Sequence, residues 1–257
     1  MPLDVGGTWV SGMTVEAHEK LKRHLGISAP TVCLDARRRL ARLDEATLER
    51  LASDTRPVIL RGGLMSARLG DFSTEIPESA NGFVDELLWK KAFFEGGFYW
   101  EQTSYPLAEA TIDDLEKYPW PDLDDPRRYE TLEGEVQRLF HNTPYALVGE
   151  WRYKNFWETV TWLLGFERAL IALVAEQDFV RALLEKLYEL NETACKQSLR
   201  IAGPYLTAVR CSDDLGTQQS LLFSPKTYRS IPKPFHSRFF SLRAHRTFDC
   251  AVFGVSV

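Results

Sequence analysis

Short apolar runs alternate with longer amphipathic segments along this chain. Four such runs predict buried strands, because each is bounded by turn residues and is too short for a helix. They cover residues 2–7, 56–61, 145–149 and 206–211. The first two end in glycine pairs, Gly6-Gly7 and Gly62-Gly63, which indicate tight turns.

Helix signals lie between and after these runs. Apolar positions at helical spacing predict a helix over residues 14–25, ended by Gly26, and a long one over residues 179–202, capped by Asp178. Capping residues mark further helix starts: Asp44, Thr111 with Asp114, and Ser224 with Pro225.

Strands that alternate with helices indicate an α/β fold with a parallel sheet. Residues 64–108 interrupt this alternation with a segment rich in glycine and aromatic residues, where short antiparallel strands are expected. A complete (β/α)8 barrel typically takes about 250 residues. With only four strands predicted, the chain has room for about half of one.

The composition narrows the function classes. The 257 residues are 44% hydrophobic and 26% charged, which excludes a disordered chain, and the net charge of −5 disfavours a dedicated nucleic-acid binder. The four cysteines have no paired spacing, so no disulfide framework or zinc ribbon is indicated. With no signal peptide and no membrane-spanning run, a cytoplasmic location is expected.

The acidic pair Asp213 and Asp214 is the sharpest chemical feature, because it follows a predicted strand directly. When two carboxylates are neighbours, the pKa of one can be raised so that it acts as a general acid, while the other stays ionised and stabilises charge. Adjacent residues on a strand point to opposite faces, however. A helix-capping or turn role for the pair therefore stays open.

An aromatic cluster follows the third strand. Its members are Trp151, Tyr153, Phe156, Trp157 and Trp162. Such a wall suits a large flat ligand, and Arg152 within it could hold ligand carboxylates. The alternative is an ordinary core stripe at helical spacing.

Local motifs for metal, nucleotide or serine chemistry are missing from the sequence. The histidines are scattered, and His18 and His24 on the first helix are expected to be solvated. Cys211, at a strand end, is a nucleophile or, more in keeping with its apolar run, an inert buried thiol. No dinucleotide-binding, phosphate-loop or nucleophile-elbow pattern occurs.

Several segments together resemble the uroporphyrinogen decarboxylase superfamily, most of all its corrinoid-linked, methyltransferase-like branch. They are SDDLGTQ at 212–218, FSP at 223–225, PKPF at 232–235, DVGGT at 4–8 and DLEKYPWPD at 114–122. The resemblance covers residues 2–240. It implies a (β/α)8 barrel of TIM type and a tetrapyrrole-related substrate.

Two reactions follow from this resemblance: decarboxylation of a porphyrinogen without a cofactor, and methyl transfer between a corrinoid and a thiol with zinc. In either case it implies that Asp213 and Asp214 are catalytic. The residues expected to bind substrate are Trp151, Arg152, Trp157, Gly6, Gly7 and Gln218. The partner would be a tetrapyrrole-type small molecule or a corrinoid protein.

The chain also departs from the superfamily. Residues 6–11 carry no arginine where the decarboxylases have several, which favours methyl transfer, and the His-x-Cys zinc motif is missing before the atypical tail at 241–257. The resemblance thus implies about the first half of a barrel, with corrinoid and zinc belonging to the intact protein. An inactive fragment that pairs as a homodimer, or a non-catalytic corrinoid-binding module, remains the alternative.

Overall fold

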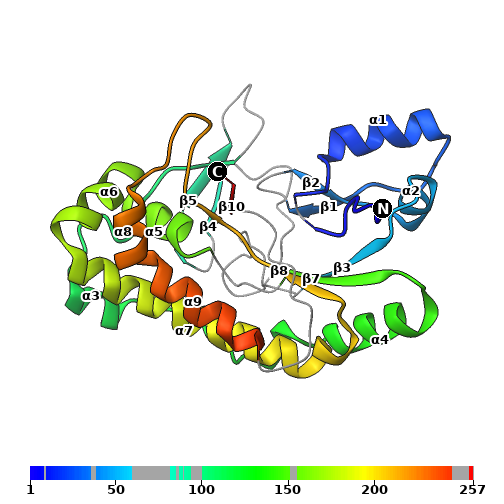
Figure 1. The fold of residues 1–257 in the computed structure, drawn as a ribbon. Coiled ribbons are helices and arrows are strands. Elements are labelled where there is room, and N and C mark those ends of the chain that lie inside the picture. The colour runs from blue at the N-terminus through cyan, green and yellow to red at the C-terminus, as the bar shows by residue number, and fades with distance from the viewer. Residues whose placement is uncertain are drawn as a thin grey trace.

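The computed structural model describes residues 1–8, 10–35, 39–59, 82–84, 87–88, 90–93, 100–150, 155–244 and 255–256. Figure 1 shows a helical layer, with α4, α7 and α9 running along one side of the strands β3, β7 and β8. A smaller N-terminal unit lies at one end of this arrangement.

The N-terminal unit follows its sequence signals closely. Helix α1 (Val15–Leu25) ends at Gly26 in the left-handed conformation (φ 71°), and α2 (Glu45–Arg50) is capped by Asp44, as predicted. Between them, β1 (Val32–Asp35) and β2 (Leu40–Arg42) pair antiparallel. A small core of Ala41, Leu43 and Leu48 holds the unit together.

The strand predicted at residues 2–7 is wrong. The backbone bends there because polar side chains capture its donors: the Gly7 amide donates to Asp4 Oδ1 (3.0 Å), and the Thr8 amide donates to Ser11 Oγ (3.1 Å). Such local bonds compete with strand pairing. The segment therefore forms a polar turn instead of a sheet strand.

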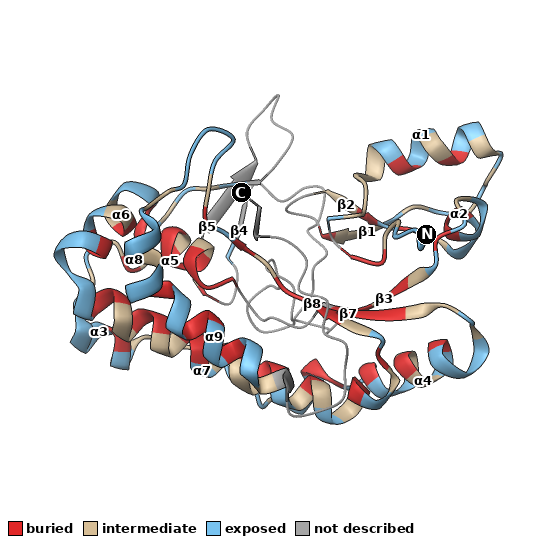
Figure 2. Ribbon diagram, in the orientation of Figure 1, coloured by how far each residue is buried: buried red, intermediate tan, exposed pale blue. Residues whose placement is uncertain are grey.

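The central sheet is parallel, as the alternation of strands and helices predicts. It contains β3 (Thr55–Ile59), β7 (Ala146–Glu150) and β8 (Ala208–Arg210), in that spatial order. The register aligns Val58 with Gly149, and Gly149 with Val209. This row faces α4 (Leu132–Asn142), and the buried surface between them forms one hydrophobic core (Figure 2).

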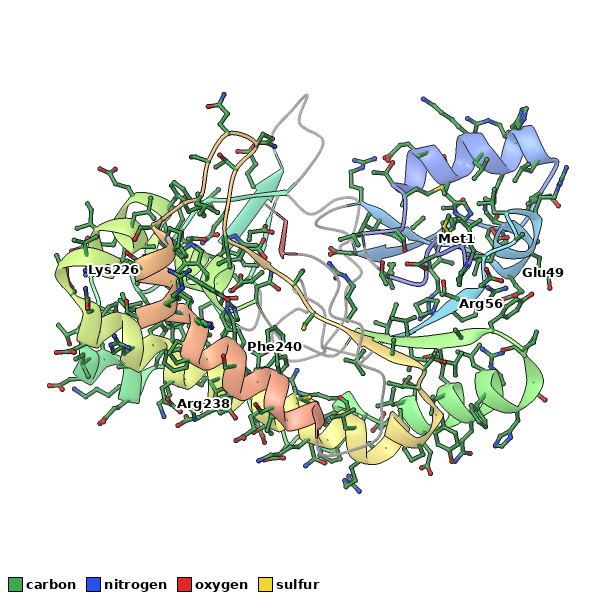
Figure 3. The ribbon with its side chains drawn as sticks, viewed as in Figure 1. Met1, Glu49, Arg56, Lys226, Arg238 and Phe240 are labelled. Carbon is green, nitrogen blue, oxygen red and sulfur yellow. The ribbon has the colours of Figure 1, made fainter. Side chains whose placement is uncertain are left out.

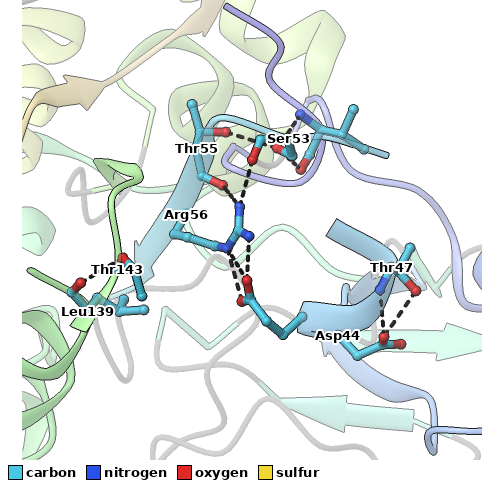
Figure 4. A network of polar contacts seen from close by, with 9 residues as sticks. Asp44, Thr47, Ser53, Thr55, Arg56, Leu139 and Thr143 are labelled. Atoms are coloured by element: carbon cyan, nitrogen blue, oxygen red, sulfur yellow. Dashed lines mark hydrogen bonds and ion pairs between the residues drawn. The ribbon is translucent and has the colours of Figure 1, made fainter. Parts of the chain in front are cut away.

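Arg56 ties the N-terminal unit to this sheet. Its Nε donates to both oxygens of Glu45 on α2 (3.1 and 3.0 Å), and its Nη1 donates to the carbonyls of Ser53 and Thr55 (2.9 and 2.8 Å; Figure 4). The guanidinium also lies 3.5 Å from the ring centroid of Tyr145. A buried arginine of this kind is tolerated because its donors are satisfied.

The largest core lies among the helices that follow β7. These are α5 (Trp157–Leu164), α6 (Phe166–Ala175), α7 (Gln177–Ala202), α8 (Pro225–Ser230) and α9 (Pro232–Ala244). The long helix is confirmed, but Asp178 does not cap it. The cap position is Glu176, whose side chain makes no capping hydrogen bond, and Asp178 lies in the first turn. The predicted cap of α8, Ser224, accepts from the Thr227 amide.

Short elements complete the described chain. The predicted antiparallel strands within 64–108 are confirmed for β4 (Gly82–Val84), β5 (Lys90–Phe93) and β6 (Trp100–Gln102). The others are α3 (Ile112–Lys117), the 3-10 turns η1 (Pro126–Arg128) and η2 (Gly203–Tyr205), β9 (Asp213–Asp214) and β10 (Val255–Ser256). Among the residues described, no helix has the length and apolar character needed to cross a bilayer.

Candidate active site beyond strand β8

The Asp213 carboxylate lies where the end of the parallel sheet meets two helices. The residue follows β8 closely and is only 5% exposed. Its Oδ2 accepts from the Trp157 amide at 2.7 Å, and its Oδ1 accepts from the amides of Glu158 and Asp214 at 3.1 Å each. This is the only place in the described chain where we find a predicted catalytic carboxylate buried.

Helix α5 explains why an acidic side chain is stable there. The first amides of a helix have no partner within the helix, and its N-terminus carries a partial positive charge. Phe156, at the cap position of α5, makes no side-chain capping bond. Asp213 supplies the missing acceptor from more than fifty positions further along the chain.

His236 on α9 is the second member of the site. Its Nε2 lies 2.9 Å from Asp213 Oδ2, and the residue is 6% exposed. The imidazole packs edge-on against Phe156 (5.3 Å between centroids) and stacks with Phe240 (6.1 Å, 18° between planes). These contacts fix the ring on both sides.

Helix α9 is itself held on α7, which sets the position of His236. Arg238 donates to both carboxylate oxygens of Glu185 (2.6 and 2.7 Å) and lies 3.9 Å from the ring centroid of Tyr188. Figure 3 labels Arg238 and Phe240, which project from different sides of α9. One side thus anchors the helix, and the other presents the imidazole to Asp213.

Tyr228 on α8 completes a chain of polar groups. Its hydroxyl lies 3.2 Å from His236 Nδ1, and the residue is half-buried. Burial, and then the negative charge of Asp213, raise the pKa of the Tyr228 phenol above its usual range. The polar chain therefore runs from a buried carboxylate, through an imidazole, to a phenol nearer the surface.

The structure separates the two members of the acidic pair. Asp213 points inward, whereas Asp214 is exposed, as expected for adjacent strand residues. The two side chains therefore do not share one buried site. The catalytic assignment of Asp214 stays a prediction that this geometry does not favour.

The predicted substrate-binding residues lie in different surroundings. Trp157 is fully buried and packs edge-on against Phe223 (4.9 Å between centroids), which is the alternative core role. Gln218 is exposed in the loop before α8. Trp151 and Arg152 lie outside the described residues.

The glycine pair has a packing role in the N-terminal unit. Gly6 adopts a positive φ of 74°, and a Cβ on Gly7 would lie 2.2 Å from Thr55 Oγ1. Both positions therefore require glycine for the turn and for close approach to β3. Their role in substrate binding stays a prediction.

The structure changes the interpretation of two histidines, His18 and His236. His18 was expected to be solvated but is fully buried in the N-terminal unit, whereas its neighbour His24 is exposed as expected. His236 was not singled out at all, because its partners are 23 and 8 residues away and no local motif marks such spacing. Within the described ranges, no group of three or more His, Cys, Asp or Glu is arranged to hold a metal ion.

The fold is that of a mixed α/β protein with a parallel sheet and flanking helices, and comparison with known proteins agrees with this class. No protein-family profile matches the chain, and no curated protein is significantly similar in sequence. A solved structure, a methyltransferase from Methanosarcina mazei, aligns with a TM-score of 0.52 and 15% sequence identity. The alignment covers 83% of this chain but only 55% of that one, so the chain spans about half the length of this structural neighbour.

Proposed function

We propose that this chain is a methyltransferase-like enzyme of the uroporphyrinogen decarboxylase superfamily, whose parallel strands belong to a (β/α)8-type barrel. The observation that carries the proposal is the likeness to a methyltransferase over 83% of the chain. The order of β3, β7 and β8 supports it, because each new strand adds on the same side of the last, as in a barrel. Decarboxylation receives no support from the comparisons, and we do not propose it.

The reaction proposed is transfer of a methyl group from a corrinoid, carried by a partner protein, to a thiol. A thiol must lose its proton to become a good nucleophile. His236 is suited to accept that proton, because Asp213 holds one ring nitrogen and thereby orients the other. Asp213 is then a positioning residue, whose carboxylate stabilises the imidazolium that forms.

The donor sets of the described residues do not fit the cofactors that the superfamily implies. No described cluster suits zinc, so no step is derived through a metal. Trp157 is fully buried and offers no face to a corrinoid. The corrinoid therefore enters this proposal only as the substrate that brings the methyl group.

The test is a methyl-transfer assay with methylcobalamin and an alkyl thiol, followed by the absorbance change as the cobalt loses its methyl group. The full chain is assayed with and without added zinc. We expect thiol-dependent turnover, and we expect His236→Gln to lower it by about 30-fold at pH 7, because without the base only the thiolate fraction of the alkyl thiol reacts. Glutamine keeps a donor toward Asp213, so the change removes the base with little loss of packing.

The matched control is Asp214→Asn, which alters the exposed carboxylate and should leave turnover within about twofold of the wild type. Lack of both methylcobalamin binding and turnover, with and without zinc, would rule out the proposed function.

A further inference from the structure

The hydrogen bonds of the polar chain at the end of β8 all donate in one direction, from Tyr228 to His236 and from His236 to Asp213. Asp213 is surrounded by donors, since three backbone amides and His236 Nε2 all lie within hydrogen-bond distance of its two oxygens. A carboxylate in this position can only accept, so the proton of a neutral His236 sits on Nε2. The other nitrogen, Nδ1, is then an acceptor, and the Tyr228 hydroxyl donates to it.

We propose that Tyr228 is a catalytic residue that passes the proton of the attacking thiol to His236. This inference rests on the proposed function and names the group through which its base reaches the substrate. His236 is 6% exposed, and both of its ring nitrogens are already engaged, so a thiol has no free lone pair of the imidazole to approach. The half-buried phenol is the member of the chain nearer the surface.

The step balances without an added reactant. The S–H bond of the thiol breaks and its proton bonds to the phenol oxygen of Tyr228, while the phenol's own proton moves to His236 Nδ1. The products are a thiolate, a neutral tyrosine and an imidazolium that faces the Asp213 carboxylate at 2.9 Å. The thiolate sulfur then bonds to the methyl carbon of the corrinoid substrate while the cobalt–carbon bond breaks and the cobalt keeps the electron pair. The imidazolium finally releases its proton through Tyr228 to water.

The surroundings of Tyr228 suit a phenol that is neutral before and after each proton transfer. The Ser224 cap and Pro225 fix the start of α8, and Tyr228 follows one turn later, with its amide bonded to the Ser224 carbonyl (3.0 Å). Burial and the charge of Asp213 raise the pKa of the phenol, so it keeps a proton at neutral pH. The titratable groups that contact His236 are Asp213, from the β9 segment, and Tyr228, from α8.

The experiment compares two thiols in the methyl-transfer assay: an alkyl thiol with a pKa near 8.5 and an aryl thiol that is already ionised at pH 7. Without the relay, only the thiolate fraction reacts, which for the alkyl thiol at pH 7 is roughly one part in 30. Tyr228→Phe should therefore slow the alkyl thiol by about 30-fold at pH 7 and recover the wild-type rate above about pH 9.5. The aryl thiol should react at the wild-type rate.

The control is Tyr205→Phe, which removes the hydroxyl of another half-buried tyrosine. That hydroxyl accepts from Gln137 Nε2 on α4 (3.3 Å), away from the polar chain. The control variant should not distinguish the two thiols. If Tyr228→Phe slows both thiols equally, or neither, the relay is wrong while the methyl-transfer function stands. If the wild type transfers to neither thiol, the proposed function itself fails.

A second measurement tests the relay without any activity. Nitrogen NMR of the histidine side chains should find the neutral form of His236 as the tautomer protonated on Nε2. Tyr228→Phe should move the Nδ1 resonance, because Nδ1 loses its hydrogen-bond donor, and should leave the tautomer unchanged. A tautomer protonated on Nδ1 would overturn the proposal, because Tyr228 would then be an acceptor from the imidazole.

Discussion

Two buried histidines in this chain each contact an aspartate, and they differ in what the second ring nitrogen meets. His18 Nε2 lies 3.3 Å from Asp44 in the N-terminal unit, and His236 Nε2 lies 2.9 Å from Asp213 beyond β8. His18 Nδ1 is buried and has no hydrogen-bond partner among the described residues, whereas His236 Nδ1 lies within hydrogen-bond distance of the Tyr228 hydroxyl. The polar contacts of the His18 pair end in the core, whereas those of the His236 pair continue through Tyr228 toward the surface.

The aspartates of the two pairs also differ, although both cap a helix. Asp44 caps its own helix by accepting from the Thr47 amide (2.9 Å), and its side chain is 19% exposed. Asp213 caps a helix distant in sequence and is nearly buried. A buried histidine that faces an aspartate is thus common to both regions, and the group on the second ring nitrogen separates a candidate site from a structural contact.

The largest expected effect is on the Asp213 pair. Asp213→Ala removes the acceptor of buried amides and leaves His236 facing a cavity, so we expect a loss of about 3–5 kcal/mol in the free energy of unfolding. Urea unfolding at pH 7 measures it. The control Asp214→Ala alters an exposed side chain and should stay within about 0.5 kcal/mol of the wild type. A loss below about 1 kcal/mol for Asp213→Ala would mean that its contacts do not stabilise the fold.

The parallel sheet could be predicted because its strands are short apolar runs, which buried parallel strands require. The runs at 56–61, 145–149 and 206–211 became β3, β7 and β8. The run at 2–7 has the same appearance but carries Asp4, whose carboxylate accepts from the Gly7 amide and turns the backbone. Local side-chain bonds of this kind are weak sequence signals, and here they outweigh strand propensity.

The candidate site was predictable only in part. Asp213 stands out because it follows a strand directly, but its split from Asp214 depends on which way each side chain points. His236 and Tyr228 meet Asp213 only after α8 and α9 fold against α5 and α7, so no spacing along the chain marks them. Contacts between distant helices of this kind require the tertiary structure.

A smaller effect is expected for the other aspartate. Asp44→Ala removes the N-cap of α2 and the contact with His18, and we expect a loss of about 1 kcal/mol in the free energy of unfolding. Asp44→Asn is the matched control, because asparagine also caps helices, and it should recover most of that loss. Thermal melting of the three proteins at pH 7 makes the comparison, and a loss for Asp44→Ala as large as that for Asp213→Ala would remove the distinction between the two regions.

The smallest effect is the pH dependence of the His18 pair. Burial, and then the charge of Lys22, lower the pKa of His18 below 6.5, against the opposite pull of Asp44 and Glu19. The unfolded chain therefore binds a proton at a higher pH than the folded chain, so stability is complete above about pH 6.5 and falls as the pH decreases through the folded pKa.

The measurement is the melting temperature of wild type and His18→Gln between pH 7.5 and 5. The pKa of Asp44 is lowered too: burial acts to raise it, but the hydrogen bonds from Thr47 prevail. The stability that Asp44 contributes is lost only at more acidic pH, near and below the usual carboxyl range. The difference between the two proteins from pH 7.5 to 5 therefore reports on His18. We expect the variant to be less stable at pH 7.5 but to lose less on acidification. An equal slope in both proteins would show that His18 takes up its proton as readily in the folded chain as in the unfolded one.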